Sequence, residues 1–396
     1  MIGIFTFDAP MYCDVNGVYC NTTVTNEMLE RFFIVVDKLF LLMRTDYLTV
    51  SYKEQNLRKL DLEDKIEVVE LPNPNTPINY ICNRSYKNII RKYVEMADLI
   101  FLRIPSIYSN IAANECIRIG KPYFAEVGGC AWDSYYNHGV LGKMMAPIVY
   151  FAQKRTVKNA SFASYVTQKW LQNRYPTNGK STVASNVYLN YFDENNIEKR
   201  LQRYATTNPI RYKIGTIASV DVRYKGQEYI VRAIAKLKIE NILLEYDLVG
   251  AGDPSFIIGL AKKLNVVELV HVRGIMLHED IWDWLDSIDI YAQPSKQEGL
   301  PRAVIEAMNR GCLAIGSDVA GIPELLEDDM IFKSCDVNGI CRVLKLLIHE
   351  KNHTRRIWRN YNLTKNFNVK LLENRRASIF NEYKQHMINN YDNSEE

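Results

Sequence analysis

Two successive series of strand-like and helical segments constrain the fold of this chain more than any other feature. In the first series, the strand-like runs are GIFTF, IEVVEL, LIFLRI, YFAEV and ASYVT, with helices between them, for example from about 26 to 42. In the second series they are YKIGTIA, LLEYDLVG, VELVHVRG, IDIYAQPS, LAIGSD and MIFK. Alternation of this kind is typical of parallel sheets covered by helices on both faces. The sequence therefore predicts an α/β protein with two doubly wound domains.

The domain boundaries follow from a change in composition. A length of 396 residues suits two domains of about 150–200 residues each. Around 190–211 the sequence turns polar and lacks apolar strand patterns, so this segment is the best linker candidate. We predict an N-terminal domain over 1–200, a C-terminal domain over 206–355, and a helical segment over about 356–388.

Composition excludes several classes of protein. Apolar residues make up 47% and charged residues 24%, as in globular proteins, and the net charge of +3 is too small to indicate nucleic-acid binding. No apolar run reaches the roughly 18–20 residues that span a bilayer. The N-terminus has no basic segment of the kind that opens a signal peptide. The eight cysteines are scattered without a C-x-x-C pair, which favours free thiols in the reducing cytoplasm over disulfides or a zinc site.

The segment EGLPRAVIEA places two glutamates, Glu298 and Glu306, around a glycine and a proline. It follows the strand IDIYAQPS, and open α/β sheets bind ligands beyond the carboxyl ends of their strands. The helix that begins after Pro301 offers free N–H groups to a phosphate. Carboxylates accept hydrogen bonds from hydroxyls, so two of them beside a phosphate site indicate a nucleotide sugar. The alternative is an ordinary helix start with one capping and one solvated acid.

The surrounding sequence resembles the retaining glycosyltransferases of family 4. The run from VGAGD to AGIPELL (249–326) is similar to that family's donor domain, and 214–237 is similar to its first β–α unit. The resemblance implies the GT-B fold, in which two Rossmann-like domains face each other across a cleft. It also implies that Glu298 contacts the transferred sugar, Glu306 the nucleotide ribose, and the amides of Gly299 and Leu300 the diphosphate.

Further donor-binding residues follow from the same resemblance. Lys225 matches the lysine that neutralises the diphosphate leaving group. This chain has Thr216 where the family often has an arginine, and Arg223 is the nearest substitute. Gly274, in the segment VRG, matches backbone that faces the base. Gly250, in GAGD, is expected in a loop near the donor, because the third glycine of a dinucleotide-binding motif is missing.

The N-terminal half, where the acceptor is expected to bind, has fewer motif residues. Gly17 matches a family loop that brings backbone close to the donor phosphate and the acceptor, although a plain strand–helix turn fits equally well. Asp133 and His138 are equal candidates for a catalytic base, and a lone histidine is more often structural. The family also implies that the helices over about 356–388 pack back onto the first domain.

The resemblance implies a hexosyltransferase that moves a sugar from a nucleotide-diphosphate sugar, with UDP favoured over GDP, to a saccharide or lipid-linked acceptor. The expected role is biosynthesis of a cell-surface polysaccharide such as capsule, O-antigen or exopolysaccharide. The expected mechanism retains the anomeric configuration and uses no metal or other cofactor. The alternatives are a GT-B epimerase or phosphorylase, an inactive nucleotide-sugar-binding module, and an NAD-dependent dehydrogenase.

Membrane contact is a separate hypothesis for this cytoplasmic protein. In NRSYKNIIRKYVEMAD the four cations fall on roughly one helical face: Arg84, Lys87, Arg91 and Lys92. Such a face could hold the protein peripherally on anionic lipid at the inner side of the cell membrane. A solvated cationic face is the alternative.

Overall fold

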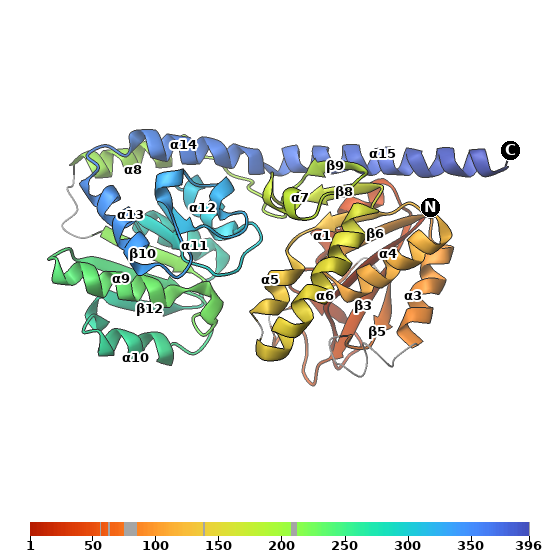
Figure 1. The fold of residues 1–396 in the computed structure, drawn as a ribbon, viewed down its shortest axis with the longest axis horizontal. Coiled ribbons are helices and arrows are strands. Elements are labelled where there is room, and N and C mark those ends of the chain that lie inside the picture. The colour runs from red at the N-terminus through yellow and green to blue at the C-terminus, as the bar shows by residue number, and fades with distance from the viewer. Residues whose placement is uncertain (56, 62–63, 75–84, 138, 207–211, 396) are drawn as a thin grey trace. The chain divides into compact units, whose positions relative to one another are not determined.

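The chain divides into two units, each built around one parallel sheet (Figure 1). The computed structural model describes residues 1–396 except 56, 62–63, 75–84, 138, 207–211 and 396. Unit 1 comprises Met1–Asn186 and Leu372–Glu396, and unit 2 comprises Val187–Leu371. The chain therefore passes between the units twice, after Asn186 and after Leu371.

The sheet of unit 1 has a parallel body with strand order β5-β3-β1-β6-β7-β8-β9. Its strands are β1 (Ile2–Cys13), β3 (Lys38–Tyr47), β5 (Ile66–Leu71), β6 (Leu99–Ile104), β7 (Phe124–Val127), β8 (Phe162–Tyr165) and β9 (Lys180–Val183). Two short strands, β2 (Tyr19–Asn21) and β4 (Arg58–Lys59), extend it through antiparallel pairing. The strand order reverses between β1 and β6, so a ligand crevice is expected at their carboxyl ends.

One group of helices in unit 1 packs in series: α3 with α4, α4 with α6, and α6 with α5. The helices are α1 (Asn26–Glu30), α3 (Ser85–Met96), α4 (Ile107–Ile119), α5 (Ala131–Tyr136), α6 (Gly139–Lys158), α7 (Trp170–Arg174) and α15 (Val369–Glu395). The C-terminal helix α15 contributes Phe380, which lies among the rings of Phe32, Phe101 and Phe124 at centroid distances of 5.5, 5.1 and 5.0 Å. Its Tyr383 hydroxyl accepts a hydrogen bond from the Ile100 amide at 3.0 Å.

The expected helix from about 26 to 42 is wrong over most of its length. Helix α1 and a 3₁₀ turn (Arg31–Ile34) occupy its first half, and β3 begins at Lys38. The run LFLLM in β3 is buried at every residue. A continuous apolar run fits a fully buried central strand and a buried helix equally well, so periodicity alone could not separate them.

Unit 2 has a parallel sheet with strand order β12-β11-β10-β13-β14-β15. The strands are β10 (Tyr212–Ile217), β11 (Leu244–Val249), β12 (Val270–Gly274), β13 (Ile290–Gln293), β14 (Leu313–Ser317) and β15 (Ile331–Phe332). Helix α9 packs against α10 and α13, and α14 packs against α12 and α8. These helices are α8 (Glu194–Thr206), α9 (Gln227–Ile239), α10 (Ser255–Lys263), α12 (Arg302–Asn309), α13 (Val337–His349) and α14 (Thr354–Thr364), with α11 (His278–Ser287) between β12 and β13. The strand order reverses between β10 and β13.

The expected linker around 190–211 is wrong over 194–206, which forms helix α8 of unit 2. The guanidinium of Arg200 is buried and donates to the carbonyls of Leu285, Ile288 and Arg310 at 2.8, 2.7 and 2.9 Å. A polar sequence therefore builds a core-facing helix, because the charge of Arg200 is satisfied by backbone acceptors. Residues 207–211 lie outside the described residues.

Candidate active site

An ion pair between Lys225 and Glu298 lies at the carboxyl ends of β10 and β13, where the strand order of unit 2 reverses. One oxygen of Glu298, Oε1, accepts from Lys225 Nζ at 2.8 Å. The same atom accepts from Gln293 Nε2 at 2.9 Å and from Ser295 Oγ at 2.7 Å. The side chains of Glu298 and Lys225 are 10% and 25% exposed. The sequence predicted both residues, and the structure brings them together.

Two backbone contacts hold the Lys225 loop against the Glu298 loop. The amide of Lys296 donates to the carbonyl of Tyr224 at 2.7 Å. Gly226 has a φ of +75°, and a Cβ at this position would lie 2.0 Å from the carbonyl oxygen of Pro294. Only glycine permits both this backbone conformation and this approach. The relative positions of Lys225 and Glu298 are thus set by backbone geometry.

Further charges surround the pair. Arg223 forms two hydrogen bonds with Glu228, at 3.0 and 2.9 Å, and lies over the ring of Phe256 at 3.6 Å. Lys296 Nζ lies 3.7 Å from the same carboxylate. Arg223 was expected as a second cation at this edge, whereas Lys296 and Glu228 were not. Their sequence neighbours carry no signal for them, because the contact joins the loop after β13 to the first turn of helix α9, far apart in the chain.

Glu306 is almost fully buried on α12, and burial raises the pKa of its carboxyl to about 7, against an opposing effect of Arg302. The buried Tyr291 hydroxyl accepts from the amide of Ile217 at 3.2 Å. The pKa of Tyr291 is raised by burial and then by the charges of Glu298 and Glu306. The two glutamates therefore lie near one phenol. In the loop before α12, the carbonyl of Gly299 accepts from the amide of Gly321 at 2.9 Å, and Leu300 packs against the core.

Gly250 and Gly274 lie at the same edge, after β11 and at the end of β12. The Gly250 amide donates to the Gly274 carbonyl at 2.9 Å. Gly250 has a φ of +151°, and a Cβ there would lie 2.2 Å from the carbonyl oxygen of Ala218. Beneath this contact the buried Asp247 carboxylate accepts from Arg273 at 3.0 and 3.2 Å. The loops after three neighbouring strands are thereby fixed at one edge of the sheet.

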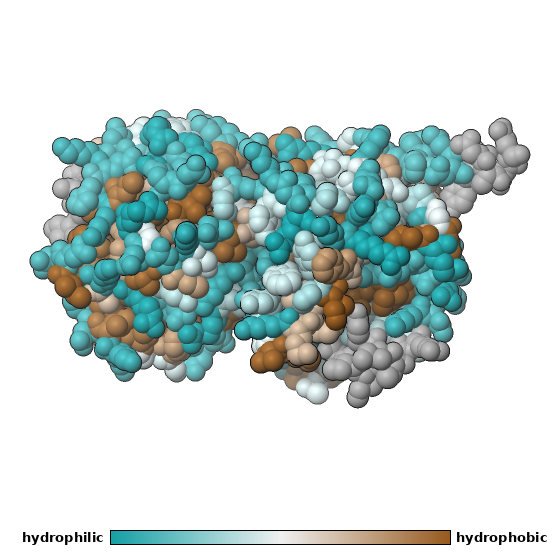
Figure 2. Space-filling model, in the orientation of Figure 1, coloured by the Kyte–Doolittle hydropathy of each residue, from teal (hydrophilic) through white to brown (hydrophobic). Residues whose placement is uncertain are grey.

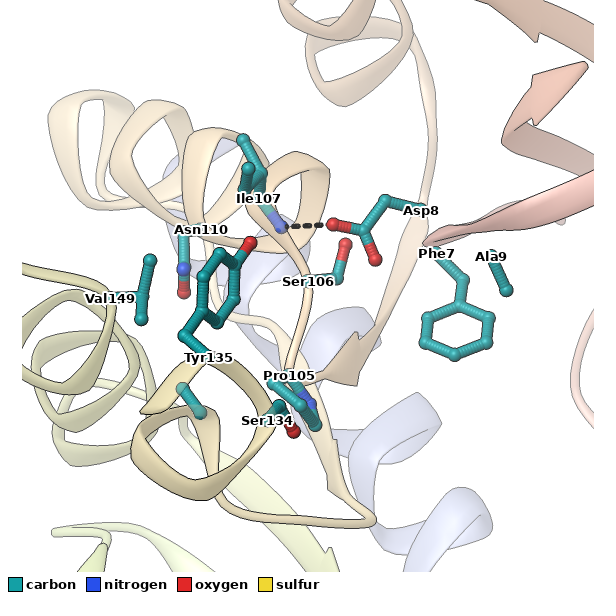
Figure 3. Close-up of a pocket in the computed structure, with 11 residues that line it drawn as sticks. Phe7, Asp8, Ala9, Pro105, Ser106, Ile107, Asn110, Ser134, Tyr135 and Val149 are labelled. Carbon is teal, nitrogen blue, oxygen red and sulfur yellow. Dashed lines mark hydrogen bonds between the residues drawn. The ribbon is translucent and has the colours of Figure 1, made fainter. Parts of the chain in front are cut away.

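Unit 1 has a pocket of about 480 Å³ at the reversal point of its own sheet (Figure 3). Its lining includes residues 7–9 after the first part of β1, 105–107 after β6, and Asn110 and Tyr135. The pairing of β1 with β3 shifts between Phe7 and Pro10, which frees the segment holding Asp8 from the ladder. Asp8 Oδ2 accepts from the amide of Ile107 at 2.8 Å. Burial nevertheless raises the pKa of Asp8 to about 6.

Of the three remaining candidates from the N-terminal half, the structure describes Asp133 and Gly17. Asp133 lies on α5 beside Ser134 and Tyr135, which line the pocket, and burial raises the pKa of its carboxyl. His138 lies outside the described residues. Gly17 has a φ of +76° in the tight turn between the antiparallel strands β1 and β2, so the alternative of a plain strand–helix turn is wrong there.

Two absences hold for the part of the chain that the structure describes. It contains no group of three or more His, Cys, Asp or Glu side chains placed to hold a metal ion. Within the same residues, no helix combines the length and apolar character needed to cross a bilayer.

Comparisons with known proteins identify the family of the chain. A family model described as glycosyl transferases group 1 matches residues 202–364. Protein CapJ of Staphylococcus aureus is 31% identical over 362 residues, which cover 87% of this chain and 90% of CapJ. The amylovoran biosynthesis glycosyltransferase AmsK of Erwinia amylovora is 32% identical over 113 residues, covering 27% and 28% of the two chains.

A solved structure resembles the chain along its length. HepE from Anabaena, in complex with UDP-glucose, superimposes with a TM-score of 0.61 and 14% identity, covering 96% of this chain and 100% of HepE. The fold is of the GT-B type, with two Rossmann-like domains, and the family match makes the chain a glycosyltransferase. The chain belongs to the group 1 glycosyl transferases.

Proposed function

We propose that this enzyme is a retaining glycosyltransferase of family 4 that transfers a sugar from a UDP-sugar. The observation that carries the proposal is the Lys225–Glu298 pair at the reversal point of the unit 2 sheet. Cations and a helix start suit a diphosphate, and a carboxylate suits sugar hydroxyls. The buried Glu306 on the same side supplies an acceptor for ribose hydroxyls. The UDP-glucose bound to HepE supports UDP as the nucleotide.

In the proposed reaction Lys225 leaves the carboxylate of Glu298 and binds the diphosphate of the donor. Its charge then stabilises the negative charge that grows on the leaving oxygen as the glycosidic bond breaks. Arg223 and Lys296 add positive charge at the same edge. The acceptor oxygen bonds to the anomeric carbon on the face that the diphosphate leaves, and its proton passes to the departing phosphate oxygen, which gives retention. This proposal assigns no step to a metal ion.

The acceptor is proposed to be a saccharide, free or lipid-linked, bound in the unit 1 pocket. Asp8 can accept a hydrogen bond from the attacking hydroxyl, and the Tyr135 ring offers an apolar face to a pyranose. Transfer requires a state in which the sugar held by unit 2 reaches this hydroxyl. We place this activity in the cytoplasm, in the biosynthesis of a cell-surface polysaccharide. The name of AmsK, an amylovoran biosynthesis glycosyltransferase, supports a biosynthetic role.

The first experiment is a thermal-shift panel of UDP, GDP and ADP and their sugars, because a ligand of the native state raises its stability by mass action. The donor that stabilises the protein is then incubated with acceptor saccharides, and the anomeric configuration of the product is read by proton NMR. An inverted product would exclude the retaining mechanism.

The same assays separate the rival functions. Binding without turnover would indicate an inactive module. Conversion of the donor sugar to its epimer without any acceptor would indicate an epimerase.

A further inference from the structure

Helix α6 of unit 1 carries a stripe of exposed apolar side chains. The exposed fractions are 77% for Val140, 60% for Leu141, 69% for Met144, 52% for Ile148 and 66% for Phe151. At about 100° per residue these positions share one face of the helix. Figure 2 shows hydrophobic surface over the lower part of α6 in that view. Contiguous exposed apolar side chains of this kind mark an interaction site.

Charge on the same helix is of one sign. The α6 sequence contains no Asp or Glu. Four exposed cations lie beside the apolar stripe or at its C-terminal end: Lys143, Lys154, Arg155 and Lys158. Among the described residues none of the four forms a salt bridge. Their charge is therefore available to an anionic partner.

Aromatic rings border the stripe. Trp132 stacks on Tyr136 at 5.6 Å, and Lys143 lies over the Tyr136 ring at 5.5 Å. Lys154 lies over the ring of Tyr150 at 5.9 Å. Aromatic rings with a polar atom, and lysines with long apolar stems, are suited to the boundary between lipid chains and water.

We propose that the exposed face of α6 docks on an anionic lipid bilayer, with its apolar stripe at the level of the acyl chains and its cations among the headgroups. A second copy of this chain is a poorer partner, because a symmetric contact would bring the cations of α6 together. The cationic face expected on α3 is a poorer docking surface, because Arg91 pairs with Glu115 at 3.1 Å and Arg84 lies outside the described residues.

The buried face of the same helix contributes Val149 to the unit 1 pocket. If that pocket binds the acceptor, as proposed above, docking would bring it close to a lipid-linked saccharide. The docking surface itself does not depend on that function.

The test is co-sedimentation of the full chain with vesicles of phosphatidylcholine alone or of phosphatidylcholine mixed equally with phosphatidylglycerol, at low and high salt. We expect binding to the anionic vesicles only, weakened by salt. The double variant Met144→Asp/Phe151→Asp should weaken binding at least about tenfold. Lys154→Ala should weaken it about fivefold. The matched control is Ile239→Asp in unit 2, an 84% exposed isoleucine, which should bind like the wild type.

Three outcomes would overturn the proposal: equal binding to both kinds of vesicle, wild-type binding by the double variant, or self-association without lipid that the double variant abolishes. Turnover with a water-soluble acceptor separates this test from that of the proposed function. It should be unchanged in the double variant, and its loss would mean that the stripe serves a contact within the enzyme.

Discussion

At the scale of single residues, Glu298 concentrates three hydrogen bonds on one carboxylate oxygen. Glu298→Gln keeps the size of the side chain but removes the charge that we propose to lie beside the developing positive charge on the sugar. We expect kcat to fall by about 10²–10³ with a smaller change in KM. Steady-state kinetics with one donor measures this, and circular dichroism controls for folding. Wild-type turnover would refute the role assigned to Glu298.

Ionisation of the buried Glu306 carboxyl should lower the stability of the folded state. Because burial raises its pKa to about 7, the folded state holds a proton that the unfolded state releases near its ordinary value. The resulting loss of unfolding free energy is absent below the unfolded pKa. It grows as the pH rises from the unfolded to the folded pKa, and it reaches about 3 kcal/mol above the folded pKa. Glu306→Gln mimics the neutral acid, so this variant should be more stable than the wild type at about pH 8, with no difference at about pH 4.

Urea unfolding of both proteins at the two pH values measures this effect. If Glu306 also holds ribose hydroxyls, the same variant should show a raised donor KM with little change in kcat. Higher stability with an unchanged KM would leave Glu306 as a structural residue only.

Asp8 should give the reaction an acidic limb in its pH profile. Because the pKa of Asp8 is raised to about 6, its carboxylate forms only as the pH rises through this value. This carboxylate is the group proposed to accept a hydrogen bond from the attacking hydroxyl. We expect acceptor kcat/KM to fall about tenfold per pH unit below this pKa. Asp8→Asn should be slow and lack this limb, whereas Asp133→Asn serves as the neighbouring comparison. An unchanged profile in Asp8→Asn would exclude the assignment.

The sequence could single out candidate residues that stand in short motifs, namely Lys225, Glu298 and Glu306. The structure pairs Lys225 with Glu298, and it places Glu306 near Tyr291, as it does Glu298. Lys296 and Asp8 were missed for different reasons. Lys296 becomes a candidate through its contact with Glu228 on another element, and Asp8 through a shift in strand pairing and through burial.

At the scale of secondary-structure elements, most strands of the parallel sheets could be predicted, because each is a short apolar run between turn residues. Strand β3 and helix α8 could not. Strand β3 contains the continuous apolar run LFLLM, which lacks a diagnostic period. Helix α8 has a polar sequence, and its buried Arg200 is satisfied by backbone carbonyls. In both cases tertiary burial, and not local pattern, decides the structure.

Helix α15 should be essential to the stability of unit 1. Phe380→Ala would remove a ring packed among three other phenylalanines and leave a cavity, at a cost of about 3–5 kcal/mol. Gln385→Ala changes an exposed residue of the same helix and should be nearly neutral. Chemical denaturation of both variants tests this. Equal stability would mean that α15 is not part of the unit 1 core.

At the scale of the whole molecule, the two units have separate hydrophobic cores. We therefore expect two transitions in calorimetry. Saturating UDP, at about a hundred times its Kd, should stabilise only the transition of unit 2, by about 2.7 kcal/mol. A fragment of residues 187–371 identifies that transition. A UDP shift confined to the other transition would place the nucleotide site in unit 1.

The interleaved order of the units also has a consequence for biosynthesis. All of unit 2 is contiguous and leaves the ribosome before Leu372–Glu396, which complete unit 1. Until these last residues emerge, Phe32, Phe101 and Phe124 lack the ring of Phe380 that covers them. The N-terminal unit can therefore close its core only after Leu372–Glu396 have been translated, and a chain terminated before them would present an apolar surface to chaperones and proteases.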